Sequence, residues 1–162
     1  MKVRDATPAD VAFVIPRMRE ADAREVYAAR FAPDPQALVD DMIAGLPWRI
    51  GFLALAGDDG APIALLAAGL STPTVAEVLM VATDAWPKIA FPATRFVLRV
   101  AIPCYLGPNV RRAECKAWVG NVASRRWLKT LGFAEEGVLA AYGRRGEAFV
   151  QCAWVNPRFP NV

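Results

Sequence analysis

The sequence NVASRRWLKTLGF at residues 121–133 has the pattern of a short helix that leaves one strand and leads into the next. Asn121 is typical of the N-cap position, where a short side chain accepts a hydrogen bond from a free backbone N–H. Gly132 predicts the end of the helix, because glycine readily adopts the left-handed conformation that stops one. The predicted buried face consists of apolar residues four apart, Ala123, Trp127 and Leu131.

Two polar side chains at the start of this helix have two interpretations. Asn121 and Ser124 lie three residues apart, on one edge of the helix start and beside unpaired backbone N–H groups. They can cap the helix and do nothing else, which is common helix chemistry. They can also hydrogen-bond a ligand that passes across the helix N-terminus.

The rest of the chain predicts an α/β fold with a mixed sheet. An N-terminal strand is followed by helices that begin near Thr7, Arg17 and Asp34, and then by a hairpin with strands over 48–56 and 62–70. We next expect a strand over 75–83, an amphipathic helix ending near Pro103, a strand over 113–119, the helix described above and a closing hairpin over 133–155. This order favours a central sheet flanked by helices.

Length and composition limit the classes of function. The 162 residues suit one domain, which we assign to residues 1–162. The chain contains no histidine, which excludes Ser-His-Asp and Cys-His catalysis and most zinc sites, so we expect no metal. A formal net charge of +3 with dispersed arginine pairs argues against a nucleic-acid partner. No apolar run reaches the roughly 18 residues of a membrane-spanning helix, so we expect no membrane partner.

The N-terminus and the cysteines predict a cytoplasmic protein. Residues 1–4 lead directly into a predicted strand, without an apolar leader segment. Cys104, Cys115 and Cys152 are odd in number and each lies among apolar residues, which predicts buried, reduced thiols.

Residues 121–133 resemble the last sequence motif of the GNAT superfamily of N-acyltransferases. The shared features are Asn121, the small residue Ser124 three positions later, and Gly-Phe eleven and twelve positions later. Ser124 at its position is most similar to the branch that acylates protein N-termini and related amines. The predicted order of strands and helices also matches the GNAT fold over nearly the whole chain.

A narrower resemblance is to GNAT-like proteins of tailed phages and prophages, including an internal virion protein of podophages. It rests on the sequence WVGN at residues 118–121 and RWLKTLG at residues 126–132. It implies an alternative function, in which the fold works by binding, as a virion component or a modulator of a host factor, with weak or no catalysis.

The GNAT resemblance implies a site for acetyl-CoA between the fourth and fifth strands, here 75–83 and 113–119, which diverge in that fold. The residues implied for acetyl-CoA or coenzyme A are the backbone of Val81, Ala82 and Thr83, the side chains of Asn121 and Ser124, and, for the phosphates, Lys88 and Arg95. Ordinary solvated surface is an equal alternative for the two basic residues. The acceptor would be an amine, either a small molecule or a protein N-terminus or lysine, that attacks the thioester directly in a ternary complex.

Two carboxylates are candidates for the base that takes the proton of the incoming ammonium. Asp84 follows the fourth strand, beside the implied site, although aspartate before a helix is also an ordinary capping residue. Glu77 within the strand is the second choice.

The chain departs from the GNAT pattern in two places. The segment 85–95, where the family has a glycine-rich phosphate loop, contains no glycine and two prolines, which removes N–H donors from the phosphate site. Many GNAT enzymes place a tyrosine seven residues after the motif's asparagine to protonate the leaving thiolate, and here that residue is Leu128. The leading prediction is an acyl-CoA-dependent N-acyltransferase, and the two departures are the reason to keep the binding protein as the alternative. A homodimer and a virion assembly are the assemblies considered for the chain.

Overall fold

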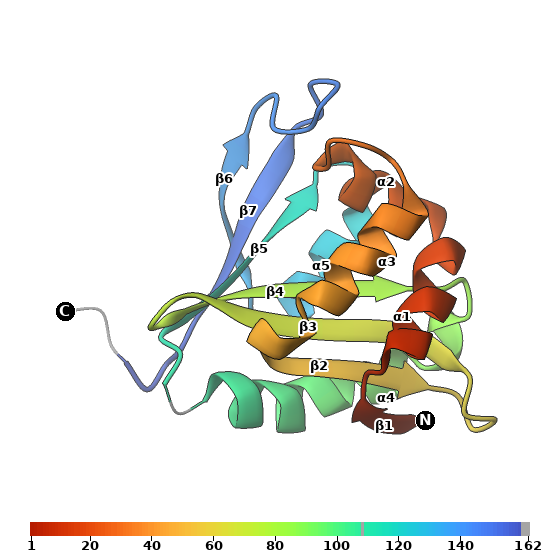
Figure 1. The fold of residues 1–162 in the computed structure, drawn as a ribbon. Helices are drawn as coiled ribbons and strands as arrows, with labels where there is room; N and C mark the ends of the chain where they lie inside the picture. Colours follow the sequence, from red (N-terminus) through yellow and green to blue (C-terminus); the bar gives the residue numbers. More distant parts are fainter. Residues whose placement is uncertain (108, 160–162) are drawn as a thin grey trace.

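A mixed sheet organises the chain, and Figure 1 shows its strands fanning apart on one side. The structure is a computed structural model that describes residues 1–107 and 109–159. Over these residues seven strands pair in the order β1-β2-β3-β4-β5-β7-β6. The strands are β1 (Lys2–Asp5), β2 (Arg49–Ala56), β3 (Pro62–Thr72), β4 (Val75–Ala82), β5 (Arg112–Trp118), β6 (Ala134–Leu139) and β7 (Phe149–Val155). The β4–β5 pair is parallel, and the other neighbours are antiparallel.

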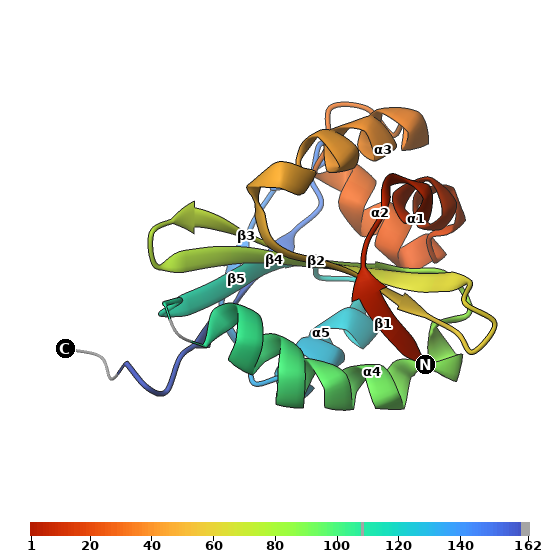
Figure 2. The same cartoon turned by 60° about the horizontal axis from the view of Figure 1, so that its bottom comes forward.

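Helices cover both faces of the sheet, as Figure 2 shows. One face carries α1 (Pro8–Val14), α2 (Glu20–Ala28) and α3 (Pro35–Ala44), and the other carries α4 (Ala90–Phe96), its continuation η4 (Val97–Leu106) and α5 (Val122–Thr130). Short 3₁₀ turns are η1 (Ile15–Arg17), η2 (Leu46–Trp48) and η3 (Trp86–Lys88). The predicted α/β fold with a mixed sheet is confirmed. Within the described part of the chain, no helix combines the length and the apolarity needed to cross a membrane.

The two faces of the sheet have separate apolar cores, because successive side chains of a strand point to opposite sides. The core under α1 and α3 includes Val11, Val14, Phe52, Leu65 and Val81. The core under η4 and α5 includes Val97, Ala113, Leu128, Phe133 and Cys152. Helices on opposite faces of the sheet therefore pack against alternate residues of the strands.

The helix predicted to end near Pro103 extends three residues further, to Leu106. Its last part, η4, is a π-helix. A proline inside a helix removes one N–H donor, and irregular turns of this wider kind are where helices tolerate such a loss. Gly107 then allows the chain to turn tightly, because a Cβ atom there would lie 2.1 Å from the carbonyl oxygen of Pro103. Cys104 on this helix is exposed, so the prediction of a buried thiol is wrong there.

The segment between η1 and α2 differs from the prediction in a way that affects the site. We expected a helix from Arg17, but α2 begins at Glu20, since Met18 and Arg19 are extended, with ψ of 144° and 146°. Met18 forms an isolated antiparallel bridge with Thr83, just after β4. Pro16 breaks the preceding helix and leaves these residues free to pair with a strand end.

The side chain of Asn156 connects the end of β7 to the exit of η4, and we expect its removal to be destabilising. Asn156 is 2% exposed, and its Nδ2 donates to the carbonyl oxygens of Gly107 at 3.1 Å and Val110 at 2.9 Å. Asn156→Ala leaves buried carbonyls without donors and should lower the free energy of unfolding by about 2 kcal/mol. Urea unfolding measures this, with the exposed Asn109→Ala as control; equal stability of the two variants would contradict the expectation.

Candidate active site

The predicted divergence of the fourth and fifth strands is present. β4 and β5 pair at Val75–Glu77 with Arg112–Glu114, and beyond that point they separate. Figure 1 shows β5, β7 and β6 turning away from the plane of β2, β3 and β4. A cavity of about 740 Å³ lies at this gap, lined from α2 and α3 on one face and from η4 and α5 on the other. We call it the central cavity.

The edge of β4 that faces the gap is partly occupied by the chain itself. The N–H of Ala82 donates to Oδ2 of Asp22 at 2.9 Å, and its carbonyl accepts from the N–H of Arg19 at 2.8 Å. The N–H of Thr83 instead donates to the carbonyl oxygen of Ile63 on β3, at 2.8 Å. Alternate residues of a strand direct their peptide groups to opposite neighbours, so Met80 has the same orientation as Ala82 and turns its N–H and C=O toward the gap.

The predicted strand residues are therefore placed as follows. Val81, Ala82 and Thr83 are each at most 8% exposed, and the peptide groups of Ala82 are already hydrogen-bonded to α2 and the residue before it. Met80 lines the central cavity, and sequence reasoning missed it. Met80 is identified because alternate residues of β4 direct their peptide groups to β3 and to the gap. Only the strand register shows which residues face which side.

Asn121 caps α5, as the first interpretation predicted. Its Oδ1 accepts from the N–H of Ser124 at 3.2 Å, and its Nδ2 donates to Oε2 of Glu25 at 3.2 Å. Asn121 is 4% exposed, whereas Ser124 is half-buried and lines the central cavity. A ligand contact by either residue stays a prediction, and the exposure favours Ser124.

Glu25 on α2 is a residue of the gap that sequence reasoning missed. Its Oε2 accepts from the N–H of Trp118, at the end of β5, at 2.8 Å and from Asn121. Burial raises the pKa of Glu25 to about 7, against the lowering effect of these hydrogen bonds, and the nearby Asp22 raises it further. Asp22 and Glu25 are three residues apart on one helix face, so one helix binds the diverging ends of β4 and β5.

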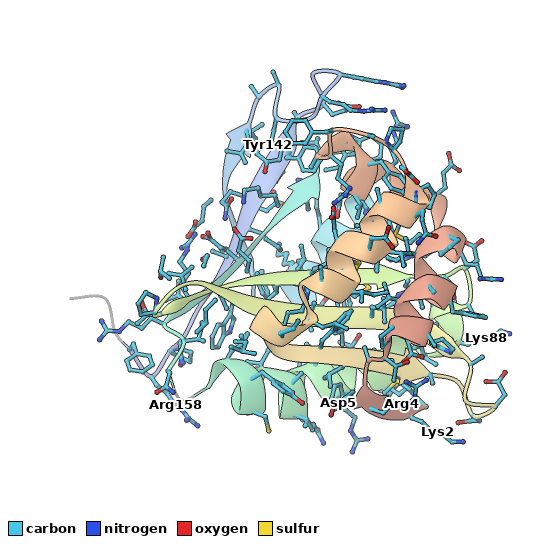
Figure 3. The ribbon with its side chains drawn as sticks, in the orientation of Figure 1. Lys2, Arg4, Asp5, Lys88, Tyr142 and Arg158 are labelled. Carbon is cyan, nitrogen blue, oxygen red and sulfur yellow. The ribbon has the colours of Figure 1, made fainter. Side chains whose placement is uncertain are left out.

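The other predicted charged residues lie in three different places. Glu77 lines the central cavity, with Oε1 3.8 Å from Nζ of Lys116. Asp84 and Lys88 are exposed and line a second cavity of about 620 Å³, which lies beyond the C-terminal end of β4. Figure 3 places Lys88 and Tyr142 at different ends of the molecule. Arg95 is exposed on α4 and lines neither cavity.

The segment after β4 uses most of its own amides. Trp86 donates to Thr83 O, Lys88 to Ala85 O and Ile89 to Trp86 O, each at 3.0 Å. Ala85 donates to the hydroxyl of Thr83 at 3.3 Å. The buried indole of Trp86 packs edge-on against Trp127, with ring centroids 5.4 Å apart. These bonds, together with the two prolines that have no N–H, reduce the number of donors available here for a phosphate.

The cavity wall contains groups that could protonate a thiolate, although none stands in the place of the family's tyrosine. That place is taken by Leu128, which is 8% exposed, lines the central cavity and has no proton to donate. Tyr105 from η4, Tyr142 from the β6–β7 connection and Cys115 from β5 line it as well. The contact with Cys152 and burial raise the pKa of the Cys115 thiol far above its usual range, so it is a poor proton donor.

Comparisons with known proteins agree on the fold and supply no sequence relative. No protein-family model matches the chain, and no curated protein matches it in sequence. Among solved structures, a ribosomal-protein-alanine N-acetyltransferase from Brucella melitensis superposes with a TM-score of 0.72 at 18% identity, over 96% of this chain and 99% of that one. Ard1 from Thermoplasma volcanium gives 0.70 at 14% identity, over 96% and 97% of the two chains.

A variant of the spermidine N-acetyltransferase of Vibrio cholerae gives a TM-score of 0.71 at 14% identity, over 96% of this chain and 95% of that one. These similarities cover almost the full length of both partners in every case. The chain therefore has the fold that these proteins share, which is the GNAT fold.

Proposed function

We propose that the chain, acting as one domain, is an acetyl-CoA-dependent N-acyltransferase. The observation that carries the proposal is the cavity between β4 and β5 with the half-buried carboxylate of Glu25, of pKa about 7, on its wall. The names of two structures that share the fold, a ribosomal-protein-alanine N-acetyltransferase and a spermidine N-acetyltransferase, support amine acetylation as the reaction class. The peptide groups of Met80 would hold the pantetheine arm like an added strand, and Ser124 would contact it from α5.

The proposed reaction is direct transfer. The nitrogen of a neutral amine attacks the thioester carbonyl carbon, the tetrahedral intermediate collapses, and the carbon–sulfur bond breaks to release the coenzyme A thiolate. The amine must first lose a proton, and Glu25 is the best-placed acceptor, because both of its described hydrogen bonds are to Oε2 and leave Oε1 free. A pKa near 7 also matches a base that works at neutral pH.

Glu77 is the second candidate for this base. It lies on the same wall as Glu25, on the face of α2 and α3, but it is 61% exposed and paired with Lys116. Asp84 stays a prediction with less support, because it lines the second cavity. A proton for the thiolate would come from Tyr105 or Tyr142, which line the central cavity, or from water.

The alternative function, binding without turnover, has one observation in its favour. The amides of the segment after β4 are largely hydrogen-bonded within the segment, which reduces the usual cradle for a pyrophosphate. A phage or host-factor role stays a prediction from the sequence resemblance alone, as do assembly into a homodimer or a virion.

Coenzyme A binding separates the two functions. At a ligand concentration near a hundredfold Kd, coenzyme A should raise the melting midpoint by about 5 °C or more. Ser124→Ala should reduce this rise, whereas Thr130→Ala, on the exposed side of the same helix, should not. Release of free thiol from acetyl-CoA with a panel of amines is the second measurement. No thermal shift together with no thiol release would exclude the acyltransferase and leave the binding function.

A further inference from the structure

Two arginines on the wall of the central cavity have guanidinium nitrogens without a hydrogen-bond acceptor. Among the described residues, the Nε atoms of Arg30 and Arg49 are buried and unpartnered. Arg30 follows α2 and forms an ion pair with Asp41 through its Nη2. Arg49 opens β2 and has no ion pair in the described part of the chain. Both line the central cavity.

The surroundings of Arg49 hold its guanidinium without neutralising it. Its Cζ lies 4.9 Å from the ring centroid of Phe52. Gly45, the C-cap of α3, lies so close that a Cβ atom there would be 3.5 Å from Nη2 of Arg49. Burial lowers the pKa of Arg49. A half-buried cation with an unused donor is costly to maintain, and an anion from outside the chain would relieve that cost.

One carboxylate of the cavity wall, Asp41, is paired with Arg30, whereas Glu77 and Glu25 lie away from Arg49. Arg49 pairs with Gly69 across β2 and β3, and Gly69 pairs with Glu77 across β3 and β4. The three residues thus form one row across the sheet, on one face. Two strand spacings separate Arg49 from Glu77, which is about 10 Å between their Cα atoms. Glu25 lies beyond, at the end of β5.

The cavity therefore has two charged ends. Its acidic end, with Glu77 and Glu25, is at the gap where the proposed reaction occurs, and its basic end is Arg49, because Arg30 is already paired with Asp41. We propose that the acceptor amine carries a carboxylate several bonds from its nitrogen, as in an ω-amino acid or a short peptide, and that Arg49 binds this carboxylate. The inference rests on the proposed function, because it places the amine at the gap.

The charge distribution disfavours two simpler acceptors. A plain alkylamine would leave Arg49 unpaired, and a polyamine would bring a second cation toward it, which like charges oppose. An α-amino acid carries its two charges on one carbon and cannot reach both ends of a row of three strands. A guanidinium offers a carboxylate two parallel N–H donors, Nε and one Nη, and the Nε of Arg49 is unused.

Steady-state kinetics with matched amines tests the proposal. With the wild-type protein and acetyl-CoA, 5-aminopentanoate should show a KM at least tenfold lower than butylamine, with a similar kcat. Arg49→Gln should raise the KM for 5-aminopentanoate by about tenfold or more and leave that for butylamine unchanged. Arg49→Lys, which keeps the charge but loses the paired donors, should fall between. Arg158→Gln, exposed after β7, is the control.

Binding without acetyl-CoA supplies a second readout, and circular dichroism checks that each variant folds. 5-Aminopentanoate alone should raise the melting midpoint of the wild type and of Arg49→Lys more than that of Arg49→Gln. Equal KM values for the two amines, or a preference that survives in Arg49→Gln, would overturn the proposed acceptor while the acyltransferase function stands. If no amine releases thiol, the acyltransferase fails, and the thermal shift alone decides whether Arg49 binds a carboxylate.

Discussion

Glu25→Gln is expected to lower kcat for acetyl transfer by about a hundredfold or more. The removal of a general base typically costs a factor of 10² to 10⁴. Glutamine keeps the shape of the side chain, and its carbonyl oxygen can still accept from the N–H of Trp118 and the amide of Asn121. It cannot take a proton. Thiol release in single-turnover experiments measures the effect, and Glu20→Gln, exposed on the same helix, is the control.

The pH profile makes this prediction specific. The wild-type rate should rise with pH and level off above a pKa of about 7, since the base acts only when Glu25 is ionised. In Glu25→Gln this limb should disappear. If the variant keeps both the rate and the limb, Glu25 is not the base, and Glu77→Gln becomes the next variant to test.

Ionisation of Glu25 should lower the stability of the protein, whereas it should raise the rate of transfer. The folded-state pKa of about 7 lies above the ordinary value of 4.5, so the folded state holds its proton more tightly than the unfolded chain. Stability from this group is present at low pH and is lost as pH rises from about 4.5 through 7. Glu25→Gln should therefore be at least as stable as the wild type at pH 8, which separates a catalytic defect from a folding defect.

Asp10→Ala is expected to lower the free energy of unfolding by about 3 kcal/mol at neutral pH. Asp10 is 4% exposed and accepts from both terminal nitrogens of Arg4. It also accepts from the N–H of Thr7 at 2.8 Å, and the Thr7 hydroxyl caps the helix in return. The variant loses the capping box and charged hydrogen bonds together. Asp5→Asn, five residues away and exposed at the sheet edge, is the control; Figure 3 labels Arg4 and Asp5.

The acid dependence of Asp10 has the usual sign for a paired carboxylate. Its hydrogen bonds with Arg4 lower the folded-state pKa from 3.8 to about 2. The contribution of about 2 kcal/mol is complete above pH 5 and is lost as pH falls toward 2. The stability difference between the wild type and Asp10→Asn, measured by urea unfolding, should therefore shrink between pH 4 and pH 2. A difference that stays constant over this range would contradict the assigned ion pair.

Local sequence chemistry predicted the elements that depend on near neighbours. Asn121 caps α5 by a hydrogen bond within three residues, and Gly132 ends it with a positive φ of 90°, so both could be read from the segment 121–133. The order of strands and helices followed from apolar periodicity. The end of η4 did not, because a proline stops an α-helix but not the wider turn that forms there.

The cavity wall depended on tertiary structure. No local motif distinguishes Glu25 and Asp22 from other polar residues of a helix, and their role depends on the contact of α2 with the ends of β4 and β5, more than fifty residues away. Burial at that junction changes the pKa of Glu25, and no local pattern reports burial. Arg49 and Glu77 likewise share a row through the register of three strands. The sequence by itself thus determined the fold and one edge of the site, whereas pairing and burial decided which charges face the cavity.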